Sequence, residues 1–121
     1  QATTEGVPET ALVTRLLEQG LSTIRHPGVV FRPGPSGWRA ALAGGPDVDE
    51  VVRALRSGGA TGDDAVAATA ADLGIDARLV RIAVDYAAEH LEEIEARLRD
   101  NDEAAERVRR LTEARAAVLA E

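Results

Sequence analysis

Apolar residues recur every three or four positions through most of the chain, which is the spacing of one face of an α-helix. The pattern predicts a first helix from Pro8 to about Arg25, with Gly20 as an alternative early end. Asp47 and Glu50 have the spacing of a capping box and predict the start of a second helix. The same reasoning predicts four helices after the first, over residues 47–55, 61–73, 76–98 and about 103–120.

Between the first two helices the pattern changes from helical to alternating. His26-Pro27-Gly28 ends the first helix, and residues 29–31 predict a short strand. The turn-forming residues 34–37 follow, and residues 38–42 predict a second strand. A two-stranded hairpin alone is marginally stable in water, so it must pack on the helices or pair with another chain.

The segment from Ala70 to Ala83 has the spacing of a helix-turn-helix. Gly74 can take a positive φ and end the first helix, while Ile75 fills the corner. Asp76 is a suitable cap for the second helix. We therefore expect a mostly α fold with a helix-turn-helix three-helix core, a small β-hairpin and long C-terminal helices.

In the last third of the chain, a row of apolar residues extends over a longer stretch than the core of a compact domain requires. Six apolar residues alternate by three and four, as in a coiled coil: Val80, Val84, Ala87, Leu91, Ile94 and Leu98. Asp100-Asn101-Asp102 is expected to interrupt the helix, and a final Ala- and Arg-rich helix follows. Three kinds of surface could cover this apolar row: another part of the same chain that folds back, a second copy of the chain, or a different bound protein. We expect an N-terminal helix (1–25), a core domain (26–99) and a C-terminal helical arm (100–121).

Composition narrows the classes of function. The chain of 121 residues is 45% hydrophobic but only 2% aromatic, so its core must consist of Ala, Val, Leu and Ile. A net charge of −7, with Arg as the only basic residue besides two His, argues against binding nucleic acid irrespective of sequence. The absence of Cys excludes a disulfide framework and agrees with a cytoplasmic protein. No membrane segment is expected. The absence of Met indicates that the native start is missing and that a preceding domain is an open alternative.

Signals for catalysis are poor. His26 and His90 lie far apart in sequence and lack a partner at ligand spacing. The turn at residues 34–37 lacks the strand and helix of a nucleophile elbow. Residues 58–62 are rich in glycine but contain no Lys to reach a phosphate. We expect a protein that is not an enzyme and that needs no metal or other cofactor.

Arg78 and Arg81 are the candidate DNA-binding residues. They lie three positions apart on the second helix of the helix-turn-helix and share one face, from which an Arg can recognise guanine or hold a phosphate. Asp72, Asp76 and Asp85 lie close by in sequence and would repel the DNA backbone. The alternative is a helix-turn-helix that serves only as a packing scaffold.

Several short motifs together resemble a known family. They are His-Pro-Gly-Val-Val-Phe-Arg (26–32), Gly-Pro-Ser-Gly (34–37), Ala-Ala-Leu-Ala-Gly-Gly-Pro-Asp-Val (40–48), Val-Val-Arg-Ala-Leu (51–55), the stretch 74–83, Tyr86-Ala87 and Glu92-Glu93-Ile94. The chain resembles an actinobacterial branch of the family "domain of unknown function 433" over residues 26–95. Trp38 and Asp49 depart from that pattern, in which an Arg and an aromatic residue are expected.

The resemblance implies a small, homeodomain-like helical domain. Members are often encoded beside PIN-like ribonuclease toxins, and some are VapB-type antitoxins, at times behind a separate DNA-binding domain. No catalytic signature accompanies the family. The resemblance therefore implies a cognate PIN-like toxin as partner. We also expect the chain to form a homodimer. If it is a DNA-binding regulator instead, operator DNA is a further partner.

An acidic chain with a projecting helix suits a nuclease that has a basic RNA groove and a carboxylate metal site. The candidate partner-binding residues are the arginines Arg97, Arg99, Arg107, Arg109 and Arg110 and the apolar anchors Leu91, Ile94, Leu98, Val108 and Leu111. The leading hypothesis is the antitoxin of a type II toxin–antitoxin system. Two alternatives are a DNA-binding transcriptional regulator, which would use Arg78 and Arg81, and a non-catalytic oligomerisation module.

Overall fold

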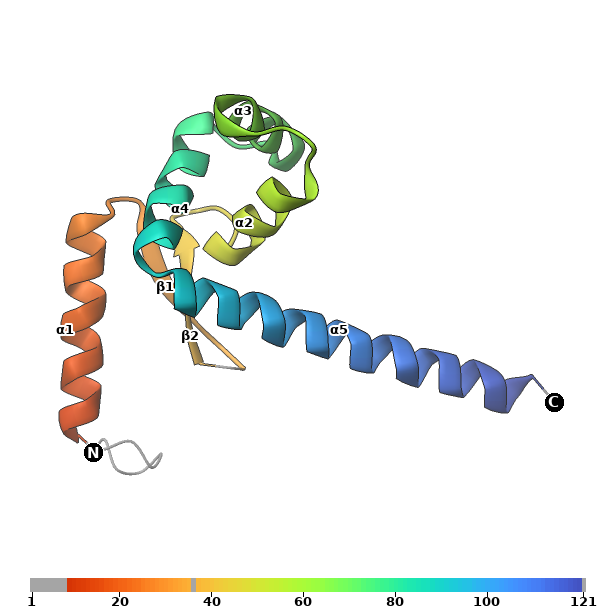
Figure 1. Ribbon diagram of the computed structural model, residues 1–121. Helices are drawn as coiled ribbons and strands as arrows, with labels where there is room; N and C mark the ends of the chain where they lie inside the picture. The colour runs from red at the N-terminus through yellow and green to blue at the C-terminus, as the bar shows by residue number, and fades with distance from the viewer. Residues whose placement is uncertain (1–8, 36, 121) are drawn as a thin grey trace. The chain divides into compact units, whose positions relative to one another are not determined.

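The chain is mostly helical and carries one small antiparallel hairpin, as predicted (Figure 1). The computed structural model describes residues 9–35 and 37–120. In order, the elements are α1 (Glu9–Arg25), β1 (Val29–Gly34), β2 (Gly37–Leu42), α2 (Val48–Ser57), α3 (Gly62–Leu73), α4 (Ala77–Glu89) and α5 (Leu91–Leu119). They fall into two compact units, residues 1–89 and residues 90–121. Pro8 and Ser36, which the sequence placed in a helix start and a turn, lie outside the described residues.

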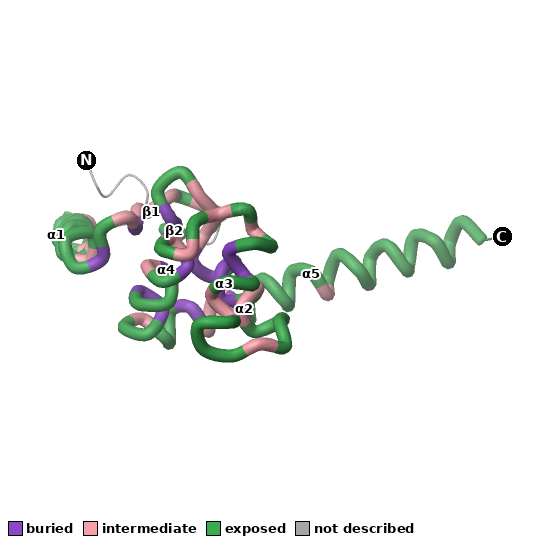
Figure 2. The backbone as a smooth tube through the Cα atoms, turned by 90° about the horizontal axis from the view of Figure 1, so that it is seen from above, coloured by how far each residue is buried: buried purple, intermediate pink, exposed green. Residues whose placement is uncertain are grey.

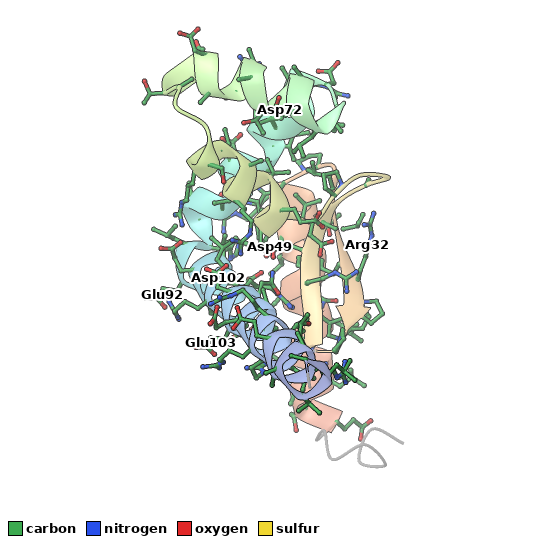
Figure 3. All side chains as sticks on the ribbon, turned by 90° about the vertical axis from the view of Figure 1, so that its right-hand side faces the viewer. Arg32, Asp49, Asp72, Glu92, Asp102 and Glu103 are labelled. Atoms are coloured by element: carbon green, nitrogen blue, oxygen red, sulfur yellow. The ribbon has the colours of Figure 1, made fainter. Side chains whose placement is uncertain are left out.

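The hairpin is longer than the sequence predicted. Its register runs from the pair Val29–Leu42 to the pair Gly34–Gly37. Pro33 is tolerated in β1 because the outer edge of a two-stranded sheet needs no N–H donor. The guanidinium of Arg32, which projects from β1 (Figure 3), donates to the carbonyl oxygens of Gly45 at 2.9 Å and Leu42 at 3.0 Å. These bonds hold the chain against the hairpin where it turns toward α2.

The predicted capping box at the start of α2 is confirmed. The Asp47 N–H donates to Glu50 Oε1 at 3.3 Å. The carboxylate of Asp47 also pairs with Arg39 of β2, whose Nε lies 2.6 Å from Asp47 Oδ2. The residue that caps α2 is therefore also bound to the hairpin.

The core lies where the hairpin packs against α2 and α4 (Figure 2, purple). Its largest fully buried side chains are Val29, Leu42, Val48, Val51, Val80 and Tyr86. Tyr86 is the one aromatic side chain among them, which agrees with the aliphatic core expected from the composition. On α4 the buried face runs through Val80, Ala83 and Tyr86, whereas Val84, which the sequence placed in the apolar row, is exposed.

The turn between α3 and α4 has the geometry that the sequence predicted. Gly74 adopts the left-handed conformation with φ 68° and ψ 34°. The N–H of Ile75 donates to the carbonyl of Ala70 at 3.0 Å, which closes the end of α3. Asp76 Oδ1 accepts from the backbone N–H of Arg78 at 2.7 Å and so caps α4.

Two sequence predictions about the C-terminal helices are wrong. The helix expected from Asp76 to Leu98 ends at Glu89, because His90 adopts the non-helical φ −129° and ψ 42°. The interruption expected at residues 100–102 is absent, and α5 runs unbroken from Leu91 to Leu119. Asp and Asn cost well under about 1 kcal/mol each inside a helix, and helix propagation over many turns outweighs that.

None of the described helices is both long and apolar enough to cross a membrane. The first helix, α1, begins at Glu9 and continues through Gly20, so the glycine does not end it. None of its 17 residues is buried.

Candidate functional site

The distal half of α5 presents an apolar stripe on an otherwise charged helix. We call it the distal α5 surface; its apolar members are Val108, Leu111, Val118 and Leu119. Their spacing places them on one side of the helix, at 3.6 residues per turn. These side chains are between 51% and 81% exposed. Side chains of this kind gain about 1.5–3 kcal/mol each when fully buried, so the stripe favours association with another apolar surface.

Arg115 lies within this stripe. It follows Leu111 by four positions and precedes Val118 by three, which places its guanidinium stem on the same face. Arg115 was not among the predicted partner-binding residues, because its place among apolar side chains becomes visible only when the positions of the helix are grouped by face. An exposed Arg among apolar side chains can bind a carboxylate through two parallel hydrogen bonds.

Arg109, one of the predicted partner-binding residues, forms ion pairs with other side chains of α5. Its guanidinium contacts the carboxylates of Glu106 and Glu113, with a 3.2 Å distance from Nη1 to Glu113 Oε1. Pairs at three and four positions apart stabilise a helix by about 0.2–0.5 kcal/mol each. Arg109 therefore points along the charged flank of α5, away from the distal α5 surface.

The remaining predicted residues of α5 fall into two groups. Ile94 and Leu98 are 2% and 9% exposed, so neither is an exposed apolar anchor. Leu91, Val108 and Leu111 are exposed. Among the predicted arginines, Arg97 is half-buried, and the other four are exposed: Arg99, Arg107, Arg109 and Arg110. The surface that α5 offers to a partner is thus shifted toward its C-terminal half.

Acidic side chains cover the middle of α5. Asp102 and Glu103 project from it (Figure 3), and together with Glu106, Arg107 and Arg110 they line a shallow, open depression on the helix surface. Within the described residues no group of three or more His, Asp or Glu side chains is arranged to hold a metal ion.

The candidate DNA-binding residues lie on the surface of α4. Arg78 and Arg81 are both exposed, in the first two turns after the Gly74 turn. Arg81 Nη2 lies 3.8 Å from Asp63 Oδ1 at the start of α3, a weak and solvent-exposed ion pair. The two arginines are therefore accessible, with acidic neighbours beside them.

The tertiary structure also forms a cluster that the sequence analysis missed. His26 is buried, and its Nε2 lies 2.8 Å from Glu89 Oε2. Glu89 also contacts Arg25, and the imidazole meets the ring of Tyr86 edge-on at 5.4 Å. These residues join the end of α1 to the end of α4. No local signal relates position 26 to position 89, so sequence spacing could not have found the cluster.

Comparison of the chain with protein-family models, with curated proteins and with solved structures finds no match. The resemblance to the family "domain of unknown function 433" therefore stays a prediction.

Proposed function

We propose that this chain is the antitoxin of a type II toxin–antitoxin pair and inhibits a PIN-like ribonuclease by binding it through the distal α5 surface. The observation that carries the proposal is the exposed stripe of Val108, Leu111 and Val118, with Arg115 among them. A long helix with one apolar stripe is a common form of helix-in-groove recognition.

Charge supports a nuclease as the partner. The chain carries a net charge of −7, and an enzyme that binds RNA presents a basic groove. Opposite charges raise the association rate and select the partner, while the apolar stripe supplies binding energy. Acidic side chains such as Asp102 and Glu103 are suited to the basic rim of such a groove.

Arg115 supplies the proposed means of inhibition. A PIN-like nuclease uses carboxylates to hold its metal ion, and a guanidinium is a strong bidentate partner for a carboxylate. Arg115, carried into the groove by the apolar stripe, competes with the metal and the RNA for those carboxylates. The homeodomain-like core then serves to present α5.

The proposal is tested by co-expression with the ribonuclease encoded beside the gene, followed by pull-down and an RNA-cleavage assay. We expect the unaltered chain to bind and inhibit the enzyme. Leu111→Asp should abolish both effects. Ala117→Asp, on the opposite face of α5, should leave both unchanged, which controls for added charge. Inhibition that survives Leu111→Asp contradicts the assigned surface, and no binding by the unaltered chain contradicts the function.

Arg115 has a test of its own within that assay. Arg115→Ala should weaken inhibition more than it weakens binding, because the apolar stripe remains. Arg115→Lys keeps the charge but loses the bidentate geometry, so it should restore inhibition only in part. Equal inhibition by all three chains contradicts the role of the guanidinium.

A second candidate function, sequence-specific DNA binding, is favoured by the exposure of Arg78 and Arg81 directly after the Gly74 turn. A gel-shift assay with the chain's own promoter tests it. Steep salt dependence and loss of binding in Arg81→Ala would support the regulator. Ala117→Asp serves again as the control.

A further inference from the structure

Thr112 lies in the distal half of α5, directly behind a pair of arginines. Its hydroxyl is exposed and donates to the carbonyl oxygen of Val108, one turn earlier in the helix, at 2.9 Å. Arg109 and Arg110 stand three and two positions before it, and no other Ser or Thr of the sequence has arginine at both of these positions. Protein kinases use such charge patterns to select an acceptor, and two arginines suit a kinase with an acidic substrate groove.

The helix around Thr112 can open to present the hydroxyl. A kinase has to release the hydroxyl from Val108 before it can transfer a phosphoryl group to it. Within the described residues none after Leu98 is buried, so opening this part of α5 breaks up no packed core. A helical segment without packing is marginal in water and opens at a low free-energy cost. Thr69 of α3, by contrast, is buried in the folded core.

The two arginines are accessible to a kinase as well. Arg110 is exposed. Arg109 has a side chain that is 60% exposed, and it pairs with Glu106 and Glu113 of the same helix. Exposed ion pairs of this kind are weak, so local opening of the segment releases the guanidinium for other carboxylates.

We propose that Thr112 is a phosphorylation site for an arginine-directed serine/threonine protein kinase, with ATP as the phosphoryl donor. The Oγ1 of Thr112 attacks the γ-phosphorus of ATP, and a new bond between oxygen and phosphorus forms. The bond from that phosphorus to the oxygen bridging the β- and γ-phosphates breaks, and ADP leaves. The hydroxyl proton passes to the catalytic base of the kinase. The step involves no oxidation or reduction.

The phosphate changes the charge of the distal half of α5. From position 107 to position 119 the helix carries four arginines and one glutamate, which is a net charge of +3. A phosphothreonine adds a charge of about −1.5 to −2 at pH 7, so it removes half or more of that positive charge. Phosphorylation therefore weakens the attraction of this segment to an acidic partner surface.

Arg115 is the side chain that the phosphate affects most directly. It stands three positions after Thr112, a spacing at which two side chains of a helix meet. Phosphate oxygens accept two parallel hydrogen bonds from a guanidinium, and a guanidinium held in this way is lost to a carboxylate of the ribonuclease. We therefore expect phosphorylation to relieve inhibition. This regulatory role rests on the proposed function, whereas the modification itself does not.

The site is tested by incubation of the whole chain with ATP, Mg²⁺ and a purified kinase that requires arginine two and three positions before its acceptor. We expect the chain to gain the mass of one phosphate group, which tandem mass spectrometry locates on Thr112. Thr112→Val keeps the volume of the side chain and should gain none. Phosphate on another residue, or no uptake by the unaltered chain, would overturn the proposal.

Three control positions separate recognition by the arginine pair from simple exposure. Arg110→Gln should lower the rate of uptake by about tenfold, because the acidic groove loses a charged partner. Arg107→Gln removes an exposed arginine five positions before Thr112 and should be modified like the unaltered chain. Ser57 is exposed and donates to the carbonyl oxygen of Arg53 at 2.8 Å, but it lacks the arginine pair and should stay unmodified. Equal rates for the two arginine variants would contradict the assigned recognition.

The regulatory role is tested by inhibition of the ribonuclease with the phosphorylated chain. Its affinity should be about tenfold lower than that of the unmodified chain, because a hydrogen bond between charged groups is lost. Phosphatase treatment should restore inhibition, and Thr112→Val should inhibit equally with and without kinase. Equal affinity before and after phosphorylation would overturn the regulatory role. If the unmodified chain fails to inhibit, the proposed function fails, while a phosphate mapped to Thr112 still establishes the site.

Discussion

His26 and Glu89 lie 63 positions apart in sequence, yet the Nε2 of the imidazole is 2.8 Å from Oε2 of the carboxylate. The residue that follows α1 is thereby held at the last residue of α4. The ring of His26 is buried against the edge of Tyr86. This contact fastens the start of the hairpin to the helical core, and it makes His26 a structural residue.

Replacement of His26 tests that role. His26→Ala should lower the free energy of unfolding by about 2 kcal/mol, because it leaves a cavity beside Tyr86 and removes the imidazole that contacts Glu89. Urea unfolding followed by circular dichroism measures the change. Glu89→Gln should cost less, because that side chain is half exposed. Equal stability of the two variants would contradict the assignment.

Gly74 is expected to be required for its backbone conformation alone. Gly74→Ala should destabilise the chain by about 1–2 kcal/mol, since an L-residue pays that cost in the left-handed region. The added Cβ would meet no atom within 4 Å, so no steric clash contributes. Gly59→Ala, which also has open space, is the matched control and should be nearly neutral. Thermal unfolding of both variants measures the difference, and equal midpoints for Gly74→Ala and Gly59→Ala would contradict the prediction.

Asp47 is expected to stabilise the fold in two ways, as the cap of α2 and as the ion-pair partner of Arg39. Asp47→Ala removes the cap of α2 and the ion pair with Arg39, so it should cost about 2 kcal/mol. Asp63→Ala is the control: its carboxylate stands at the start of α3 but is 93% exposed, and its contact with Arg81 is long. That variant should unfold like the unaltered chain. Similar decreases in the free energy of unfolding for Asp47→Ala and Asp63→Ala would contradict this role of Asp47.

Removal of the distal half of α5 should separate folding from partner binding. Within the described residues, none after Leu98 is buried. A chain that ends at Asp102 should therefore keep its thermal midpoint within about 4 °C, the shift that 1 kcal/mol produces in a domain of this size. It should lose inhibition of the ribonuclease. A large fall in the midpoint would show that the distal half of α5 supports the fold.

Local signals predicted most of the elements. Periodicity located the helices, Gly74 and Asp76 defined the turn between α3 and α4, and Asp47 with Glu50 marked the start of α2. The break at His90 was missed because neither glycine nor proline stands there and the apolar spacing continues on both sides. The candidate surface on α5 was predicted in part: Val108 and Leu111 are exposed, while Ile94 and Leu98 are buried.

By itself the amino-acid sequence determined most of the helices and the turn at Gly74, because capping, glycine conformation and apolar spacing act over a few neighbouring residues. Only the tertiary structure decided which faces are covered. It buried His26 beside Glu89, and it left Leu17 of α1 and the stripe through Leu111 exposed. The physical reason is that burial depends on which distant segments meet, and a local apolar pattern has the same spacing whether its cover comes from the same chain or from another.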